Sequence, residues 1–432
     1  MYSDKIQEIL NEEEIDTGDY IKAGDYEGKL MPKPENGDPN SVIVKLESGY
    51  NIGVKTQEIE LLEKRETEEQ ALTEVEHSGE KADILVLHTG GTIASRVSYE
   101  EGGVKPAFDP EDLIEMYPEV AEEVNLHSEM LAQMYSSDME PEHWQMIAEK
   151  VDEVKEEYDG IIIGHGTDTM AYTGGALQLM LKGIDTGVML LGSQRSSDRP
   201  SSDAPMNLYC VSKFLAETDF SGVGMCMHSS VNDDECVILP AAKSRKMHTS
   251  RRDTFEAINA EPIAKVDYET GEIEENFDNE EREYEFQPEL DKDVRIIKMR
   301  PGTKVDEIDY LLEKNPDGVI IEGTGLGHGP VKVRDEKTEH HEQIREKISK
   351  LAENSVVVMT SQCINGRVNM NVYDYGLKMK EAGVISAEDM HPELAYVKLM
   401  WSLGQANSLD EAEQIMGENI AGEIQERSIY NE

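Results

Sequence analysis

The sequence predicts an α/β protein with a doubly wound, mostly parallel sheet, a smaller α/β domain after it and a small SH3-like β-barrel before it. Apolar runs of strand length at 84–87 and 161–163 indicate strands buried on both faces, as in parallel sheets. From residue 82 onward such runs alternate with segments of helical periodicity, which is typical of βαβ units. Residues 1–57 hold short β-rich segments separated by glycines, which favours the small barrel.

The predicted elements follow from their periodicity in chain order. Between Trp144 and Val154 apolar residues recur at helical spacing, so we expect an amphipathic helix over 141–158, with Pro141 in its first turn. We expect further helices at 176–181, 206–215, 392–403 and 410–416, and strands at 19–22, 26–30, 41–46, 50–54, 188–192, 237–240, 294–297, 319–321 and 356–359.

Two acidic stretches of low apolar content divide the 432 residues. Residues 58–81 are rich in Glu and cannot bury enough surface to fold, so they indicate a linker. Residues 269–293 hold 12 acidic residues against two basic ones and a turn at Gly271, which predicts an exposed hairpin or a connector. The predicted domains are the β-barrel module 1–57, the acidic linker 58–81, the larger α/β domain 82–268, the connector 269–293 and the smaller α/β domain 294–432.

The chain carries 90 acidic residues against 41 Lys and Arg, a formal net charge of −49. So large a negative surplus argues against direct binding of a phosphate backbone, which needs basic surface. It also costs stability through self-repulsion at low salt. In molar salt the Debye length is about 3 Å and this repulsion largely disappears. Because the acidic residues are spread along the whole chain, we predict a protein adapted to a salt-rich cytoplasm.

Cysteine and histidine spacing argues against disulfides and metal binding. Cys210, Cys226, Cys236 and Cys363 form no Cys-x-x-Cys pair, which fits buried, reduced thiols in a cytosolic protein. The 11 histidines lack ligand spacing, so we expect no metal site. The first residues contain no apolar core of signal-peptide length, and no run approaches 18 apolar residues. We therefore expect a cytoplasmic protein that crosses no membrane.

Two glycine-rich loops follow predicted strands, and each carries a threonine. The stretch 89–92 (Thr-Gly-Gly-Thr) follows the strand at 84–87, and 164–169 (Gly-His-Gly-Thr-Asp-Thr) follows the strand at 161–163. Both loops are expected at the carboxyl edge of the sheet, where open α/β sheets carry their sites. Glycines such as Gly91 let a ligand or another backbone come close. No dinucleotide fingerprint, P-loop or Gly-x-Ser-x-Gly elbow occurs in the sequence.

The chemistry that these loops allow is acyl transfer. A threonine hydroxyl is a weak nucleophile until a base removes its proton. A lysine is a plausible base, because desolvation and neighbouring groups lower its pKa. Backbone N–H groups of such loops can form an oxyanion hole. From the residues alone, three interpretations stay open: acyl transfer from an amide or ester without a metal, nucleotide binding, and a purely structural role of the loops.

Residues 89–94 and 164–170 resemble the two signature motifs of the L-asparaginase family (asparaginase/glutaminase type I), in this order and about 75 residues apart. The resemblance covers about residues 82–420 and implies the two-domain asparaginase-like fold for the two α/β domains. It continues at 135–139, 191–195, 246–249, 255, 323–327, 360–363 and 392–395.

The resemblance implies a catalytic group of four residues. Thr92 is expected to be the nucleophile that attacks the carboxamide. Thr167, Asp168 and Lys246 match the family's second group, in which lysine and aspartate tune the neighbouring threonine. Lys243 lies close by in the sequence, but the spacing to the following phenylalanine favours Lys246.

The same resemblance implies the substrate-binding residues. Asp168 is also expected to hold the α-ammonium group of the substrate, and Ser136 its α-carboxylate. Free asparaginases commonly have glutamine after that serine, whereas this chain has Ser137, so amino-acid recognition is expected to differ in detail. Gly91 lets the substrate approach the backbone, and Tyr99 is the candidate lid tyrosine after the first motif.

The amino-terminal module points to one branch of this family. Residues 18–20, 27–32 and 49–53 resemble the amino-terminal domain of GatD, a subunit of the archaeal Glu-tRNA(Gln) amidotransferase. In that family GatD releases ammonia from glutamine or asparagine, and the partner GatE uses it to convert Glu-tRNA(Gln) to Gln-tRNA(Gln). GatE holds the tRNA and consumes ATP with Mg²⁺, so no cofactor is expected in this chain. The resemblance also implies a homodimer within a heterotetramer.

Two alternatives remain beside the amidotransferase subunit. A stand-alone cytoplasmic L-asparaginase would hydrolyse its substrate without a partner or tRNA. A non-enzymatic scaffold on the same fold would serve only as a binding module. Such a scaffold would have no reason to keep Thr92, Thr167, Asp168 and Lys246 together.

Overall fold

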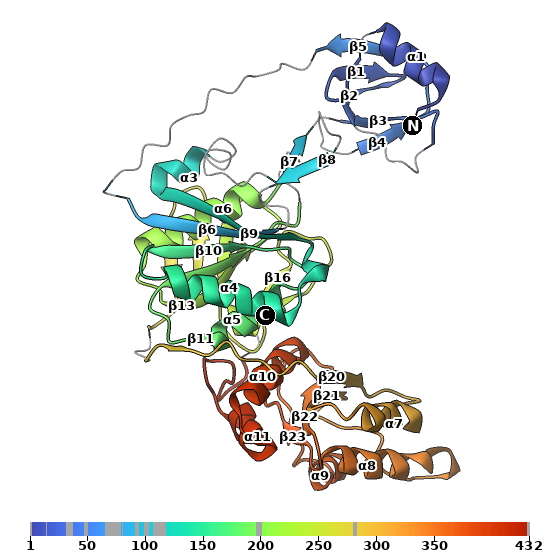
Figure 1. Ribbon diagram of the computed structural model, residues 1–432, viewed down its shortest axis with the longest axis vertical. Helices are drawn as coiled ribbons and strands as arrows, with labels where there is room; N and C mark the ends of the chain where they lie inside the picture. Colours follow the sequence, from blue (N-terminus) through green and yellow to red (C-terminus); the bar gives the residue numbers. More distant parts are fainter. Residues whose placement is uncertain are drawn as a thin grey trace.

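The structure, a computed structural model, consists of three units that follow one another along the long axis of the molecule (Figure 1). A five-stranded antiparallel sheet comes first, an eight-stranded sheet second and a four-stranded parallel sheet third. The residues that the structure describes are 2–13, 15–31, 38–46, 51–64, 79, 81–90, 95–98, 103–106, 118–195, 201–279 and 283–429.

The amino-terminal unit packs one helix, α1, against its sheet. Ile6 and Leu10 of this helix are buried in one small core with apolar residues of the strands. The strand order β4-β3-β2-β1-β5, with antiparallel pairs throughout, agrees with the predicted small barrel. The elements are α1 (Asp4–Glu12), β1 (Tyr20–Ala23), β2 (Tyr26–Met31), β3 (Val42–Lys45), β4 (Asn51–Val54) and β5 (Ile59–Glu63).

Two elements of this unit differ from the expectation. Strand β5 lies in the stretch that the sequence assigned to the acidic linker 58–81, so the sheet extends to Glu63, past the predicted boundary at 57. Ile59 is buried and pairs with Ala23, while the exposed glutamates of β5 give the segment its linker-like composition. Helix α1 is absent from the predicted elements, because charged residues dominate its short sequence.

The central sheet has the strand order β18-β17-β14-β13-β12-β10-β6-β9. Strands β9, β6, β10, β12 and β13 run parallel, and the remaining three extend the sheet with antiparallel pairs. Strand β9 lies on one side of β6 and β10 on the other, so the winding reverses between β6 and β10. Such a switch point leaves a crevice at the carboxyl ends of the strands. The strands are β6 (Asp83–Gly90), β9 (Asn125–Met134), β10 (Gly160–Gly164), β12 (Gly187–Leu191), β13 (Gly222–His228), β14 (Glu235–Pro240), β17 (Ala264–Asp267) and β18 (Ile273–Glu275).

Helices cover both faces of the central sheet, as a doubly wound fold requires. Leu85 and Leu87 of β6 join a core with α4 and α5. Ile84 and Val86 of the same strand join a second core, with α3 and α6, on the other face. This period of two along a fully buried strand is the geometry of a parallel sheet covered on both sides. The helices are α3 (Pro118–Glu123), α4 (Pro141–Val154), α5 (Met170–Met180) and α6 (Ala204–Glu217).

Three details of the central unit differ from the expectation. Helix α4 ends at Val154, ahead of the predicted end at 158. Strands β17 and β18 form a hairpin around Gly271, but its first strand precedes the predicted connector 269–293. Later in that connector β19 (Glu285–Phe286) pairs with β11 (Leu181–Lys182), so this part lies against the central unit. The remaining short strands are β7 (Ser95–Ser98), β8 (Gly103–Pro106), β15 (Ser244–Lys246) and β16 (Phe255–Ala257).

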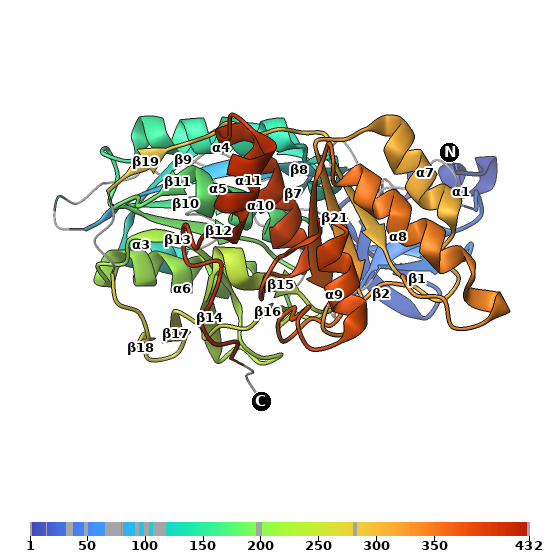
Figure 2. The same cartoon turned by 90° about the horizontal axis from the view of Figure 1, so that it is seen from below.

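The carboxyl-terminal unit is a parallel sheet of order β20-β21-β22-β23. Helices α7, α8 and α9 share a core with one of its faces. Helix α10 lies between the other face and the central unit, where the views from the side and from below both place it (Figures 1 and 2). The elements are β20 (Val294–Lys298), α7 (Val305–Lys314), β21 (Gly318–Gly323), α8 (His340–Leu351), β22 (Val356–Ser361), α9 (Asp374–Glu381), β23 (Ile385–Ser386), α10 (Pro392–Gln405) and α11 (Leu409–Gly417).

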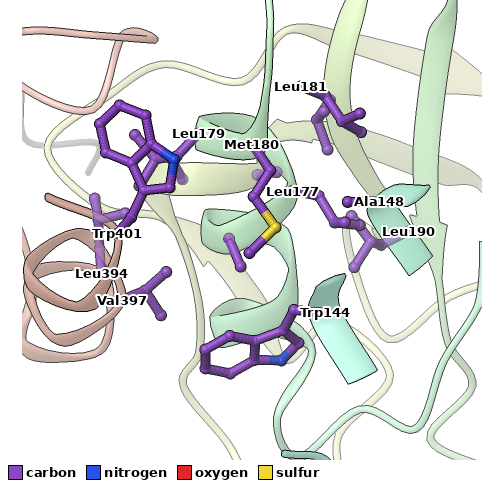
Figure 3. Packing of buried hydrophobic residues seen from close by; sticks show 14 of the residues in the cluster. Trp144, Ala148, Leu177, Leu179, Met180, Leu181, Leu190, Leu394, Val397 and Trp401 are labelled. Carbon is purple, nitrogen blue, oxygen red and sulfur yellow. The ribbon is translucent and has the colours of Figure 1, made fainter. Parts of the chain in front are cut away.

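Apolar packing joins the central and carboxyl-terminal units into one core. Leu394, Val397 and Trp401 of α10 lie beside α5, and Trp144 of α4 lies on the other side of α5 (Figure 3). Gly175 of α5 permits this close approach, since a side chain there would meet Leu394 at 3.1 Å. Removing so many apolar side chains from water stabilises the contact, at roughly 25 cal/mol per Å² of buried apolar surface.

Among the described residues, no helix is long and apolar enough to cross a lipid bilayer. All four cysteines are free thiols. Cys210, Cys226 and Cys236 are buried as expected, whereas Cys363 is exposed and departs from that expectation.

Candidate active site

The two glycine-rich loops lie side by side because they follow neighbouring parallel strands. Strands β6 and β10 pair in a register that sets His88 opposite Gly164. Just past this pair, the hydroxyl of Thr89 donates a hydrogen bond to the carbonyl of Gly164 at 2.9 Å. This contact lies at the switch point of the sheet, where a crevice is expected. The local geometry therefore brings the start of the first motif to the start of the second.

Gly90 is the last described residue of the first loop. Its φ of +123° is a backbone conformation that side chains rarely adopt, and a Cβ atom there would lie 2.1 Å from the carbonyl oxygen of Met134 in β9. Only glycine fits this position. Three expected site residues, Gly91, Thr92 and Tyr99, lie outside the described residues.

The other three expected catalytic residues lie in contact. Nζ of Lys246 is 2.9 Å from Oγ1 of Thr167 and 2.8 Å from Oδ1 of Asp168. The Lys246 side chain is only 15 % exposed, whereas that of Asp168 is 69 % exposed. Lys243, the second lysine considered, points elsewhere and forms a buried ion pair with Asp389. The structure thus places Lys246, and not Lys243, beside the threonine.

Ser136 lies against the second motif. It is buried in a single 3₁₀ turn that follows β9, and its carbonyl accepts a hydrogen bond from Oγ1 of Thr169 at 2.7 Å. Gly166 makes room for it, since a Cβ there would meet the Ser136 side chain at 2.8 Å. Ser137, the next residue, is exposed. The expected carboxylate-binding serine therefore shares one corner of the crevice with the loop of Thr167.

A third loop supports Thr167, and the sequence prediction set it aside as a loop of structural interest only. Gly192 follows β12, and a side chain there would meet Cγ2 of Thr167 at 2.6 Å. The carboxylate of Asp203 is fully buried beneath this loop at the start of α6. It accepts hydrogen bonds from the Ser193 hydroxyl at 3.0 Å and from the N–H groups of Gln194 and Arg195 at 2.9 Å each.

The sequence prediction missed Asp203 altogether. The available signal was an aspartate directly ahead of a helix that begins Ala-Pro, since acidic residues favour helix starts. That pattern indicates a cap but does not reveal that the carboxylate also holds a neighbouring loop. A buried carboxylate with several hydrogen bonds fixes its surroundings firmly, because leaving it unpaired is costly.

Two buried histidines lie behind the motif loops. Burial lowers the pKa of His88 to about 4. Burial also lowers the pKa of His165 to about 4, although its hydrogen bond with the Gly166 carbonyl opposes the shift. Nε2 of His165 lies 2.8 Å from Oγ1 of Thr173. Both rings are neutral at pH 7 and pack within the protein, so they are poor candidates for the base.

The arrangement presents a hydroxyl, an ammonium group and a carboxylate at an open crevice. A hydroxyl in contact with a lysine, which an acidic group orients in turn, is the pattern that moves protons in covalent catalysis. Within the described ranges, no group of three or more His, Cys, Asp or Glu side chains is placed to hold a metal ion.

Comparison with known families gives a consistent result over most of the chain. The family described as Asparaginase, N-terminal, matches residues 83–279, and the Glutaminase/Asparaginase C-terminal domain matches residues 293–416. The GatD N-terminal domain matches residues 15–63, which includes β5.

Similar proteins extend this result to the whole length. The chain is 43 % identical to the D-type subunit of glutamyl-tRNA(Gln) amidotransferase from Pyrococcus furiosus, with 97 % of each chain covered. It is 41 % identical to the D-type subunit of the same enzyme from Methanobrevibacter smithii, with 99 % of this chain and 98 % of the relative covered. Among solved structures, the thermostable L-asparaginase from Thermococcus kodakarensis matches with a TM-score of 0.70 and 34 % identity, covering 79 % of this chain and 99 % of its own. L-asparaginase I from Vibrio cholerae matches with a TM-score of 0.68 and 28 % identity, over 80 % and 99 %.

Proposed function

We propose, because the chain belongs to the GatD family of glutamyl-tRNA(Gln) amidotransferase subunits, that it hydrolyses the side-chain amide of glutamine or asparagine and delivers the ammonia to a partner subunit. The observation that carries this proposal is the contact of Lys246 with Thr167 and Asp168 in the crevice between β6 and β10. An amidohydrolase that uses a threonine needs a proton-transfer group at such a place.

The first step of the proposed reaction forms an acyl-enzyme. Thr92, two residues beyond Gly90 in the sequence, attacks the carboxamide carbon with its hydroxyl oxygen. Backbone N–H groups of the glycine-rich loops stabilise the oxyanion. The C–N bond then breaks. The proton that leaves the Thr92 hydroxyl reaches the departing nitrogen through the Thr167–Lys246 pair, so ammonia leaves as a neutral molecule.

The second step releases the acid. A water molecule attacks the acyl ester, its proton returns to the Thr92 oxygen, and glutamate or aspartate departs. Asp168 is proposed to bind the α-ammonium group of the substrate, which its exposed carboxylate supports. Ser136 is proposed to bind the α-carboxylate, with Gly91 giving access to the backbone and Tyr99 closing over the site. The exposed Ser137 replaces a common glutamine and is proposed to alter the choice of substrate.

Replacement of the proposed residues tests the reaction. Thr92→Ala and Lys246→Met should each lower the release of ammonia from glutamine by at least about 10³-fold, because both belong to one catalytic unit. Lys155→Met is the matched control, since Lys155 is 16 % exposed and also pairs with an aspartate, Asp152, at 3.0 Å, away from the crevice. Full activity of Thr92→Ala would refute the nucleophile and revive the non-enzymatic scaffold.

The partner is the second part of the proposal. A chain of net charge −49 lacks the surplus of basic residues that holds a phosphate backbone. We propose that a GatE-like subunit, which would carry ATP and Mg²⁺, binds Glu-tRNA(Gln) and uses the ammonia, and that the complex contains this chain as a homodimer within a heterotetramer. No cofactor is proposed for this chain itself.

Co-expression with a candidate GatE subunit tests this arrangement. The amidotransferase proposal expects a stable complex that makes Gln-tRNA(Gln) from Glu-tRNA(Gln), with glutamine hydrolysis coupled to its formation. The second candidate is a stand-alone L-asparaginase, which the similarity to the Thermococcus kodakarensis asparaginase over 79 % of this chain favours. High asparagine hydrolysis by the isolated chain, unaffected by partner and tRNA, would establish that candidate instead.

A further inference from the structure

The segment that carries Lys246 is tied to the carboxyl-terminal unit on two successive sides. Nζ of the buried Lys243 lies 2.9 Å from Oδ2 of Asp389 and 3.3 Å from the carbonyl oxygen of the same residue. Two residues later, Arg245 donates from Nε and from one terminal nitrogen to Oε1 of Glu393, at 2.9 and 2.7 Å. Both ties reach the segment that leads into α10.

Lys246 leaves the segment on the opposite side from these two ties. Strand β15 spans Ser244–Lys246, and neighbouring side chains of a strand point to opposite faces. Arg245 therefore reaches the carboxyl-terminal unit while Lys246 reaches Thr167. Ahead of the strand, the hydroxyl of Ser244 donates to the carbonyl of Pro240 at 2.7 Å, which keeps the turn compact.

Asp389 is held from three directions besides Lys243. Nδ2 of Asn259 donates to the Asp389 carbonyl at 2.9 Å, and the N–H of Gln425 donates to its Oδ1 at 3.1 Å. Asn259 also exchanges two hydrogen bonds with the backbone of Gly366, at 3.0 and 2.7 Å. The carboxylate is therefore a fixed point of the carboxyl-terminal unit, and Lys243 is attached to a rigid support.

Stability alone is a weak explanation for this pair. Burial lowers the pKa of Lys243 although Asp389 opposes the shift, so removing the two charges from water carries a cost. Apolar residues of similar volume in place of such a pair are often equally stabilising. What an apolar pair does not supply is direction, because hydrogen bonds fix both distance and angle.

We propose that Lys243 is a positioning residue that, through Asp389, fixes the backbone of 243–246 so that Nζ of Lys246 reaches Thr167. This inference rests on the proposed amidase function for its consequence in catalysis. The carboxyl-terminal unit then contributes to the chemistry without touching the described part of the crevice, since its grip on Lys243 sets the position of the lysine. A shift of about 1 Å in a catalytic group is enough to lower a rate by about 10²-fold.

The double variant Lys243→Met/Asp389→Asn tests the proposal, because it removes both buried charges together. We expect kcat for glutamine hydrolysis to fall about 10- to 100-fold with KM within about twofold, since Ser136 and Asp168 are not on this segment. The pH dependence of kcat should shift as well, because proton transfer through Lys246 is impaired. The rate at which acetylating reagent modifies Lys246, followed by peptide mass spectrometry, should rise several-fold.

The control is Ile348→Ala, which removes a buried side chain from the carboxyl-terminal core away from this segment. It should lower the melting temperature without changing the pH profile or the modification rate of Lys246. Asn259→Gly is a second variant for the case that the double variant does not fold. It releases the Asp389 carbonyl without burying a charge, and glycine suits the φ of +59° at this position.

Two outcomes overturn the inference. One is an unchanged kcat and pH profile in the double variant, or in Asn259→Gly if only that variant folds. The other is a modification rate of Lys246 equal to that in Ile348→Ala. If the wild-type chain hydrolyses neither glutamine nor asparagine, the proposed function fails, and the modification rate alone then decides whether Lys243 positions Lys246.

Discussion

The hydroxyl of Thr89 and the carbonyl of Gly164 form a buried hydrogen bond of 2.9 Å that ties the loop after β6 to the loop after β10. Both motif loops therefore start from one shared contact at the switch point of the sheet. Because the contact is buried, the loss of the donor leaves the carbonyl without a compensating bond to bulk water.

Thr89→Val removes this donor and keeps the branched shape. We expect the free energy of unfolding to fall by about 1–3 kcal/mol, because the Gly164 carbonyl is left unsatisfied. We also expect glutamine hydrolysis to fall by about tenfold, since Gly164 begins the loop of Thr167. Urea unfolding and ammonia release measure the two effects. Thr89→Ser keeps the hydroxyl and should retain both, and wild-type kinetics in Thr89→Val would contradict the role of the bond.

Gly90→Ala should be among the most destabilising small substitutions in the chain. The new Cβ would sit 2.1 Å from the Met134 carbonyl oxygen at a φ of +123°, so β6 and β9 must separate. We expect a loss of roughly 2–4 kcal/mol, measured by thermal or urea unfolding. Gly53→Ala is the control, because a Cβ at Gly53 meets no atom within 4 Å. Equal melting temperatures of the two variants would show that the close approach is not real.

Asp203→Asn should weaken the loop that supports Thr167. The amide group replaces one acceptor oxygen with a donor, so at least one of the bonds from Ser193, Gln194 and Arg195 is lost. We expect kcat to fall by about tenfold or more, with a smaller effect on KM. Asp219→Asn, at an exposed position, is the comparison. A stability loss without any change in kcat would show that Asp203 serves the fold only.

Acid should destabilise the protein at a pH well above the titration of ordinary carboxylates. His88 and His165 have folded pKa values of about 4, whereas 6.5 is the ordinary value expected in the unfolded chain. The unfolded state therefore binds more protons as the pH falls below 6.5, and the free energy of unfolding decreases until the pH reaches about 4. Above pH 6.5 the two residues contribute no pH dependence. Urea unfolding across this range measures the slope, and His165→Gln should make it shallower; an unchanged slope would assign it to other groups.

Salt should stabilise the chain over a wide range. The net charge of −49 repels itself when the Debye length is long, and this length falls from about 10 Å at 0.1 M to about 3 Å at 1 M salt. We expect the melting temperature to rise steadily with KCl concentration. A flat or falling curve would count against the prediction of a salt-rich cytoplasm.

The parts of the fold that the sequence revealed are those written in local patterns. The apolar runs of β6 and β10 and the helical spacing of α4 identified the central sheet, because burial on both faces leaves a clear signature. Strand β5 was hidden, since its exposed glutamates resemble those of a linker although Ile59 is buried. Its partner, β1, lies far away in the sequence, and no local pattern records that pairing.

The candidate site divides in the same way. Thr167, Asp168 and Lys246 were named from their motifs, and the structure brings these three together. Asp203 and Asp389 were not named, because each acts on a loop that is distant in the sequence or in another unit. A single buried aspartate has no spacing to recognise. Its importance depends on the partners that the fold supplies.

The pair formed by Lys243 and Asp389 also has a meaning in the order of synthesis. A ribosome makes Thr167 and Lys246 long before it makes Asp389, and Gln425, which holds Asp389, comes almost last. A nascent or truncated chain can fold its central sheet and still lack the anchor for its lysine. Glutamine is then spared until translation of the subunit is nearly complete, and an unfinished copy releases little free ammonia.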